Sequence, residues 1–192
     1  MCQTRNLIQL LNKNGASLLL KNFVGHFPYA KLPTGNKKKK NICLGNMANK
    51  PKVFIDTNIF LDYIEKRPVG IREAIAIFKL AALNDIHLLV SDLTIANIKY
   101  CTRKVIPLSE FYRIIRLCRE LFTIVPVGEW AIDQAIAIEP KDFEDALQYF
   151  SAEQAGADCI VTRNIADFYF ATNVEALEPE EFLNKYFPTI KY

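Results

Sequence analysis

The stretch Val53-Phe54-Ile55-Asp56-Thr57-Asn58 decides the fold, because a short apolar run ends there in an acid and two small polar residues. β-Branched and aromatic residues in so short a run are typical of a buried parallel strand. An apolar pattern then resumes at helical spacing, with Ile59, Phe60, Tyr63 and Ile64. Open α/β sheets bind ligands at the carboxyl ends of their strands, so Asp56 is expected at a binding site. The alternative is that Asp56 only caps the following helix.

Strand and helix patterns alternate along the rest of the chain. The predicted strands cover residues 53–56, 87–90, 122–127 and 159–162, with a short fifth segment near 173–174. The predicted helices cover residues 57–66, 71–82, 92–104, 107–121, 129–138 and 142–155, and a last helix starts at 179. Strands separated by helices pair in parallel, so the sequence predicts a three-layer α/β/α sandwich around a mostly parallel sheet.

The first 46 residues differ in composition from the remainder. Residues 1–50 contain nine basic and no acidic residues, so the rest of the chain carries fifteen basic and all 21 acidic residues. We predict a basic leader at 1–46 with little tertiary structure and a folded domain at 47–192. The leader could be a nucleic-acid-binding arm, an organelle transit peptide, or translated sequence upstream of a natural start at Met47. We favour the third interpretation, because Met47 leads directly into the first strand.

Several classes of protein are disfavoured by composition. No apolar run approaches the roughly 18 to 20 residues needed to cross a bilayer, so no membrane partner is expected. The five cysteines are scattered without a CxxC pair, which argues against a disulfide framework or a zinc site. The two histidines, His26 and His87, lie in the leader and in a strand pattern. We therefore expect a cytoplasmic protein with reduced thiols.

Acidic residues recur where site residues are expected. Asp56 follows the first strand, Asp167 lies past the fourth, and Asp142, Glu144 and Asp145 crowd a helix start. Asp142 and Asp145 share a helix face, and Glu144 is expected to point elsewhere. The helix dipole explains acids at a helix start but not the other two. Carboxylates gathered together repel one another unless a cation neutralises them. Mg²⁺ or Mn²⁺ would fit, and could activate water against a phosphodiester.

Four motifs occur in order along residues 52–186. They are Val-Phe-Ile-Asp-Thr-Asn-Ile-Phe-Leu-Asp-Tyr, Ser-Asp-Leu-Thr-Ile-Ala-Asn-Ile-Lys-Tyr, Asp-Phe-Glu-Asp-Ala-Leu-Gln, and Gly-Ala-Asp-Cys-Ile-Val-Thr-Arg-Asn with a following Asp-Phe. Each motif is weak alone, but together they resemble the PIN domain family, which includes VapC-type toxins. The resemblance implies a metal-dependent nuclease that usually cuts RNA and is often a homodimer. Toxin members of the family are neutralised by a small antitoxin protein.

The resemblance also implies roles for the acids. By position, Asp56 resembles the first metal-site acid of the family, Asp145 the acid of the helix motif and Asp167 the last acid. Asp142 is a reasonable auxiliary carboxylate. The resemblance therefore implies a site for Mg²⁺ or Mn²⁺ made of these four residues.

Two positions depart from the family pattern. Asn97 stands where many PIN nucleases have Glu, and Asn164 stands where many have Asp. Both are expected to line the site, with Asn97 among the catalytic residues and Asn164, Thr162 and Asn58 as auxiliary residues. An amide oxygen can accept a bond but brings no negative charge, so one well-held ion is expected more readily than two.

Three functions are compatible with these residues. The predicted function is a metal-dependent endoribonuclease of PIN type that cuts RNA, with the toxin of a toxin–antitoxin pair as one form of this function. The second is an RNA-binding module with the same fold that does not cut, motivated by Asn97 and Asn164. The third is a phosphatase with Asp56 as nucleophile, which is disfavoured because Asn58 replaces the second acid of the usual Asp-x-Asp motif.

A group of basic residues lies on the predicted helices 92–104 and 107–121. They are Lys99, Arg103, Lys104, Arg113, Arg116 and Arg119. They are interpreted first as a solvated face. If they are functional, they would steer an RNA backbone toward the acidic residues.

Overall fold

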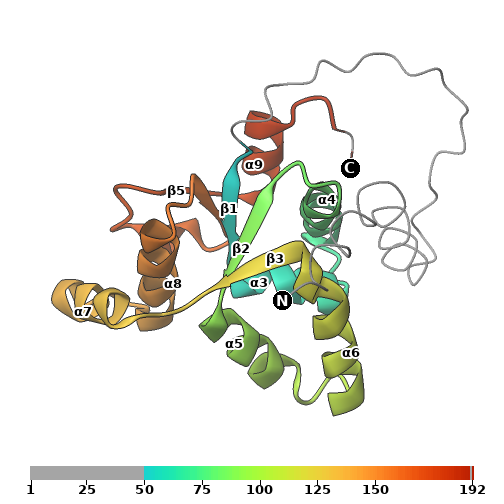
Figure 1. The fold of residues 1–192 in the computed structure, drawn as a ribbon, viewed down its shortest axis with the longest axis horizontal. Helices are drawn as coiled ribbons and strands as arrows, with labels where there is room; N and C mark the ends of the chain where they lie inside the picture. The colour runs from blue at the N-terminus through green and yellow to red at the C-terminus, as the bar shows by residue number, and fades with distance from the viewer. Residues whose placement is uncertain (1–49, 191) are drawn as a thin grey trace, which may run out of the picture. The chain divides into compact units, whose positions relative to one another are not determined.

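A five-stranded parallel sheet lies at the centre of the computed structural model, which describes residues 50–190 and residue 192 (Figure 1). The strands are β1 (Lys52–Ile55), β2 (His87–Ser91), β3 (Phe122–Val125), β4 (Cys159–Val161) and β5 (Glu175–Leu177). Their spatial order is β3-β2-β1-β4-β5, and all four neighbouring pairs are parallel. The predictions for residues 1–46 and a start at Met47 lie outside the described residues.

Helices alternate with these strands. They are α3 (Thr57–Glu65), α4 (Ile71–Ala82), α5 (Asp92–Thr102), α6 (Leu108–Cys118), α7 (Glu129–Ile138), α8 (Phe143–Gln154) and α9 (Pro179–Tyr186). Two short 3-10 helices, η2 (Arg119–Leu121) and η3 (Ile165–Phe168), complete the described elements. The predicted three-layer α/β/α architecture with a parallel sheet is confirmed. Among the described residues, no helix is long and apolar enough to span a membrane.

The strand order reverses beside β1. The chain passes from β1 to β2 and β3 on one side, then crosses to β4 and β5 on the other. The pairing continues past the strand ends, because the Asp56 N–H donates to the Val161 carbonyl at 3.1 Å and the Thr162 N–H to the Leu177 carbonyl at 3.0 Å. Asp56 and Thr162 therefore lie at the carboxyl ends of adjacent strands, at the switch point where open α/β sheets bind ligands.

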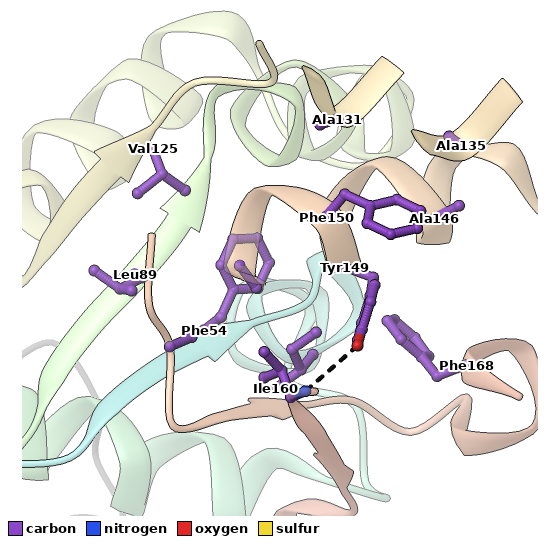
Figure 2. Packing of buried hydrophobic residues seen from close by; sticks show 13 residues of the cluster. Phe54, Leu89, Val125, Ala131, Ala135, Ala146, Tyr149, Phe150, Ile160 and Phe168 are labelled. Carbon is purple, nitrogen blue, oxygen red and sulfur yellow. Dashed lines mark hydrogen bonds between the residues drawn. The ribbon is translucent and has the colours of Figure 1, made fainter. Parts of the chain in front are cut away.

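The central strand is buried on both faces, as its continuous apolar run predicts. Phe54 packs with Leu89 and Ile160 of the neighbouring strands in a cluster that includes Ala131 of α7 and Tyr149 of α8 (Figure 2). The helices α7 and α8 therefore cover one face of the sheet. This packing holds α8, which carries several of the acidic residues, against the switch point.

A second aromatic cluster involves the helices α3 and α4. The ring of Phe60 on α3 lies edge-on to Phe78 of α4, with ring centroids 5.0 Å apart, and to Phe122 of β3 at 5.5 Å. Both Phe60 and Phe78 are fully buried. The apolar spacing of residues 57–66 thus determines which side of α3 packs against α4 and β3. This packing also sets the direction of α3, which begins directly after Asp56.

The fifth strand predicted near 173–174 is present, but β5 begins only after these residues, at Glu175. The backbone N–H groups of Thr172, Asn173 and Val174 all donate to the Tyr149 hydroxyl oxygen, at 2.9, 2.9 and 3.4 Å. Figure 2 shows one of these hydrogen bonds as the dashed line from the Tyr149 hydroxyl. These amides bind a side chain of α8, so pairing with β4 starts only after them.

We predict that Tyr149→Phe lowers the free energy of unfolding by about 1–2 kcal/mol, because three backbone donors lose their common acceptor while the ring stays packed. Urea unfolding at neutral pH measures the change. Tyr112→Phe is the matched control, because Tyr112 is exposed on α6 and should lose less than about 0.5 kcal/mol. Equal effects of the two substitutions would contradict the role assigned to the Tyr149 hydroxyl.

Candidate active site

The Asp56 carboxylate is buried, at 3% exposure, and is surrounded by neutral donors. Thr162 Oγ1 donates to its Oδ2 at 2.8 Å, and Asn58 Nδ2 donates to the same oxygen. Gln148 Nε2 donates to Oδ1 at 3.1 Å. Asp56 occupies the N-cap position of α3, yet its side chain makes no capping hydrogen bond. Asp56 is therefore more than a helix cap, because its carboxylate also accepts side-chain hydrogen bonds from Thr162, Asn58 and Gln148 at the switch point.

Glu144 lies in the same network. Its Oε1 accepts hydrogen bonds from Gln148 Nε2 at 3.0 Å and from Asn97 Nδ2, and Thr57 Oγ1 lies at 3.5 Å. The Gln148 amide thus bridges two carboxylates, Asp56 and Glu144. Asn97 on α5 reaches the site through Glu144 of α8, so three helices and the end of β1 meet here.

The expectation that Glu144 points away from the site is wrong. It rested on the spacing of Asp142 and Asp145, but Asp142 precedes the helix as its N-cap. The Asp142 Oδ1 accepts the N–H groups of Glu144 and Asp145 at 2.9 and 3.1 Å. Glu144 instead pairs with Gln148, four residues later on the same helix face. A buried glutamine at that spacing is the signal that would have identified both residues, since buried polar groups need partners.

Ser91 and Thr94 support the Gln148 amide from β2 and α5. Ser91 Oγ accepts the Thr94 N–H at 2.9 Å, which caps α5, and the two hydroxyls lie 2.9 Å apart. Thr94 Oγ1 donates to Gln148 Oε1 at 3.3 Å. This contact directs the Gln148 nitrogen toward the carboxylates, because its oxygen is engaged on the other side. Ser91 therefore caps a helix and acts on the site only through Thr94.

Burial raises the pKa of three carboxyl groups in the site, and neighbouring acids add to the effect for two of them. Asp145 is 7% exposed, and burial together with the charges of Asp56, Asp142, Glu144 and Asp167 raises its pKa to about 8. Burial also raises the pKa of Asp56, against the opposing effect of its hydrogen bonds. The pKa of Glu144 is raised by burial and then by Asp56 and Asp142. The four charged groups that raise the pKa of Asp145 are all acidic, and no ion pair joins Asp145, Asp56 or Glu144 to a basic side chain among the described residues.

Three predicted site residues follow β4, namely Thr162, Asn164 and Asp167, and they differ in how they contribute to the site. Asp167 lies in η3 and its charge acts on Asp145. The Thr162 hydroxyl also accepts from Asn58 Nδ2 at 3.2 Å and from the Asn164 N–H at 3.0 Å. The Asn164 side chain is exposed and makes no hydrogen bond to the carboxylates among the described residues. Asn164 therefore enters the site through its backbone, whereas Thr162 and Asn58 enter through their side chains.

The acidic cluster meets some of the requirements of a metal site and not others. Within the part of the chain that the structure describes, no three His, Cys, Asp or Glu side chains are arranged to hold one. The amide hydrogens of Asn58, Gln148 and Asn97 point at carboxylate oxygens that would bind it. The chemistry nevertheless fits a hard divalent cation, because several carboxylates gather here with the Thr162 hydroxyl, and hard cations prefer oxygen ligands.

Comparison with known proteins assigns the fold to a family. The sequence model described as PIN domain matches residues 52–166. The chain belongs to the PIN domain family. This PIN domain is 26% identical over 146 residues to Ribonuclease VapC1 of Aquifex aeolicus (strain VF5), a match that covers 72% of the chain and 97% of that protein.

Two solved structures share the fold of this PIN domain. A toxin–antitoxin complex from Klebsiella pneumoniae contains a chain that matches with a TM-score of 0.50 and 22% identity, covering 67% of this chain and 98% of that one. VapBC2 from Rickettsia felis, bound to a DNA fragment from its promoter, matches with a TM-score of 0.52 and 17% identity, covering 66% and 97%. The family and the fold implied by the sequence motifs are both confirmed.

We predict that Asp145→Asn changes the pH dependence of stability. The folded pKa of Asp145, about 8, lies above the ordinary value of 3.8, so its contribution is greatest at low pH and is lost as pH rises through about 8. In EDTA, the variant should therefore gain about 1–3 kcal/mol relative to the unsubstituted protein between pH 5 and pH 9. Urea unfolding at the two pH values measures it. Asp133→Asn, at an exposed position of α7, should show parallel curves.

Proposed function

We propose that this PIN domain is a ribonuclease that hydrolyses phosphodiester bonds with the help of Mg²⁺ or Mn²⁺. The observation that carries the proposal is the cluster of acids at the sheet's switch point, in which the four charged groups that raise the pKa of Asp145 are all acidic. A buried cluster of acids is costly to a fold, and a divalent cation relieves that cost. The proposal is also supported by the similarity to a protein named as a ribonuclease, along nearly its whole length.

The proposed metal-binding residues are Asp56, Asp145 and Asp167, with Asp142 as an auxiliary carboxylate. Glu144 is added to this set because it shares the Gln148 amide with Asp56. A divalent cation, when bound, supplies polarisation of the phosphodiester and activation of the attacking water. The protein's own contribution is to keep these carboxylates together in a partly dry site, where their interaction with a cation is strengthened.

The neutral residues of the site are proposed to orient the carboxylates. Thr162 and Asn58 hold one oxygen of Asp56, and Gln148 holds the other. Asn97 donates a hydrogen bond to Glu144. We propose that Asn97, which stands where many PIN nucleases have Glu, acts on the metal only by orienting Glu144. The Asn164 backbone N–H fixes the Thr162 hydroxyl, which leaves that hydroxyl's hydrogen for Asp56.

We also propose that the protein acts as a toxin controlled by an antitoxin protein. The support is the shared fold with chains of two toxin–antitoxin assemblies. A short reading frame with a DNA-binding pattern immediately upstream of the gene would support this role, and its absence would count against it. A homodimer and a cytoplasmic location stay predictions.

A second candidate function is an RNA-binding module that does not cut. It is favoured by one observation: amide hydrogens occupy the carboxylate oxygens of Asp56 and Glu144, and Asn97 brings no charge. The phosphatase alternative has no such support, because Asn58 donates to Asp56 and supplies no second carboxylate. Metal binding separates the first two functions.

We predict that Mn²⁺ raises the thermal unfolding temperature by roughly 5–10 °C at a concentration near 100 times its Kd, because it binds the folded state alone. Glu144→Gln and Asp145→Asn should each reduce the rise, whereas the exposed control Asp133→Asn should retain it. Differential scanning fluorimetry provides the measurement. No rise at millimolar Mg²⁺ or Mn²⁺ would favour the RNA-binding module.

We predict that Asp56→Asn lowers the rate of cleavage of a structured RNA in Mn²⁺ by at least about 100-fold. Cleavage is followed on a denaturing gel, and circular dichroism checks that the variant is folded. Asp145→Asn, which leaves the Asp56 hydrogen bonds in place, should give a similar loss. Unchanged cleavage in both folded variants would overturn the assignment of the site.

A further inference from the structure

A basic surface is formed by α5, α6 and the turn between them. Residues 99–119, defined here as the α5–α6 surface, contain six basic residues and one acid, Glu110. The basic residues are Lys99, Arg103, Lys104, Arg113, Arg116 and Arg119. The chain reaches this surface from the end of β2 and returns from it to β3 (Figure 1). The α5–α6 surface is therefore positively charged, whereas the rest of the domain has a net negative charge.

Most of this positive charge is available to a ligand. Glu110 pairs with Arg113 through two hydrogen bonds of 2.7 and 2.6 Å. The other five basic residues form no ion pair with a carboxylate in the described part of the chain. Arg103, Arg116 and Arg119 donate to backbone carbonyls, which leaves their charge unbalanced. Lys and Arg side chains whose charge no carboxylate balances attract the phosphates of nucleic acids.

Exposed aromatic rings accompany the charge. Tyr100 is 65% exposed and Tyr112 is 50% exposed. The Arg103 guanidinium lies over the Tyr100 ring, 3.8 Å from its centroid, and donates to the Tyr100 carbonyl. This contact holds the ring in place while most of its surface faces solvent. A fixed, exposed ring beside a guanidinium is suited to stacking with a nucleobase.

The surface begins at the acidic cluster. Asn97 of α5 donates to Glu144, which shares Gln148 with Asp56. Tyr100 follows Asn97 by three residues, so both lie on the same side of α5. A strand that stacks on Tyr100 is therefore about one helical turn from the proposed cleavage site.

We propose that the α5–α6 surface binds single-stranded RNA and directs it to the carboxylates. Bases stack on Tyr100 and Tyr112, while Arg103, Lys104 and Arg116 bind phosphates. A single strand is favoured over a duplex because its base faces are free to stack. An acidic protein segment would use the charges but would not require the exposed rings. The inference rests on the proposed function for its choice of RNA, but binding can be measured without cleavage.

The test is fluorescence anisotropy with a labelled 12-nucleotide single-stranded RNA of mixed sequence, in EDTA so that cleavage does not intervene. Tyr100→Ala should weaken binding by about 5- to 100-fold, as expected for one lost base stack. Tyr100→Phe is the matched control and should bind within twofold of the unsubstituted protein. The pair Arg103→Ala and Lys104→Ala should weaken binding and reduce its salt dependence, whereas Arg72→Ala with Lys79→Ala, on α4, should not.

Equal binding by Tyr100→Ala and Tyr100→Phe would overturn the proposal, as would duplex RNA binding as tightly as the single strand. Binding of a labelled acidic peptide that depends on Arg103 and Lys104, with RNA binding unaffected by the same substitutions, would overturn it in favour of a protein partner. The proposed ribonuclease function fails separately. If the unsubstituted protein does not cut RNA in Mn²⁺ but its RNA binding depends on Tyr100, the surface assignment stands and the enzyme assignment falls.

Discussion

A carboxylate buried where the order of a parallel sheet reverses is the constraint on which this structure depends. Removing the charge of Asp56 from water costs several kcal/mol unless other groups compensate. Thr162, Asn58 and Gln148 supply hydrogen bonds and no charge, so they hold the carboxylate without neutralising it. The strand pairing beyond Ile55 and the packing of α8 bring these donors together. The fold thus keeps a buried carboxylate at the switch point that makes hydrogen bonds but no ion pair among the described residues.

Two regions of opposite charge lie close together in the domain. The acids that raise the pKa of Asp145 form one, and the α5–α6 surface forms the other. Asn97 connects them, because it belongs to α5 and binds Glu144. A polyanion would be held by the basic surface and repelled by the acids unless a cation neutralised them. The proposed requirement for a divalent cation and the proposed path of RNA therefore have the same electrostatic origin.

Much of the fold and part of the site could be predicted from local patterns. The apolar run before Asp56 and the alternation of strands with helices are enough for a parallel α/β sheet. The positions of Asp56 and Asp167 after strands follow from the same pattern. The start of β5 was misplaced because the Tyr149 hydroxyl, 23 to 25 residues away, takes three backbone amides. No local pattern reports such a contact.

The sequence by itself determined the order of the elements and the family, because both are written in short motifs and in apolar periodicity. Only the tertiary structure decided which polar side chains meet. In the folded chain, Asp142 caps α8, and Gln148 donates hydrogen bonds to both Asp56 and Glu144. The Asn164 side chain is exposed to solvent. The physical reason is that hydrogen bonds between α8, α5 and the ends of β1 and β4 depend on how these elements pack, and packing joins residues about 50 to 100 positions apart.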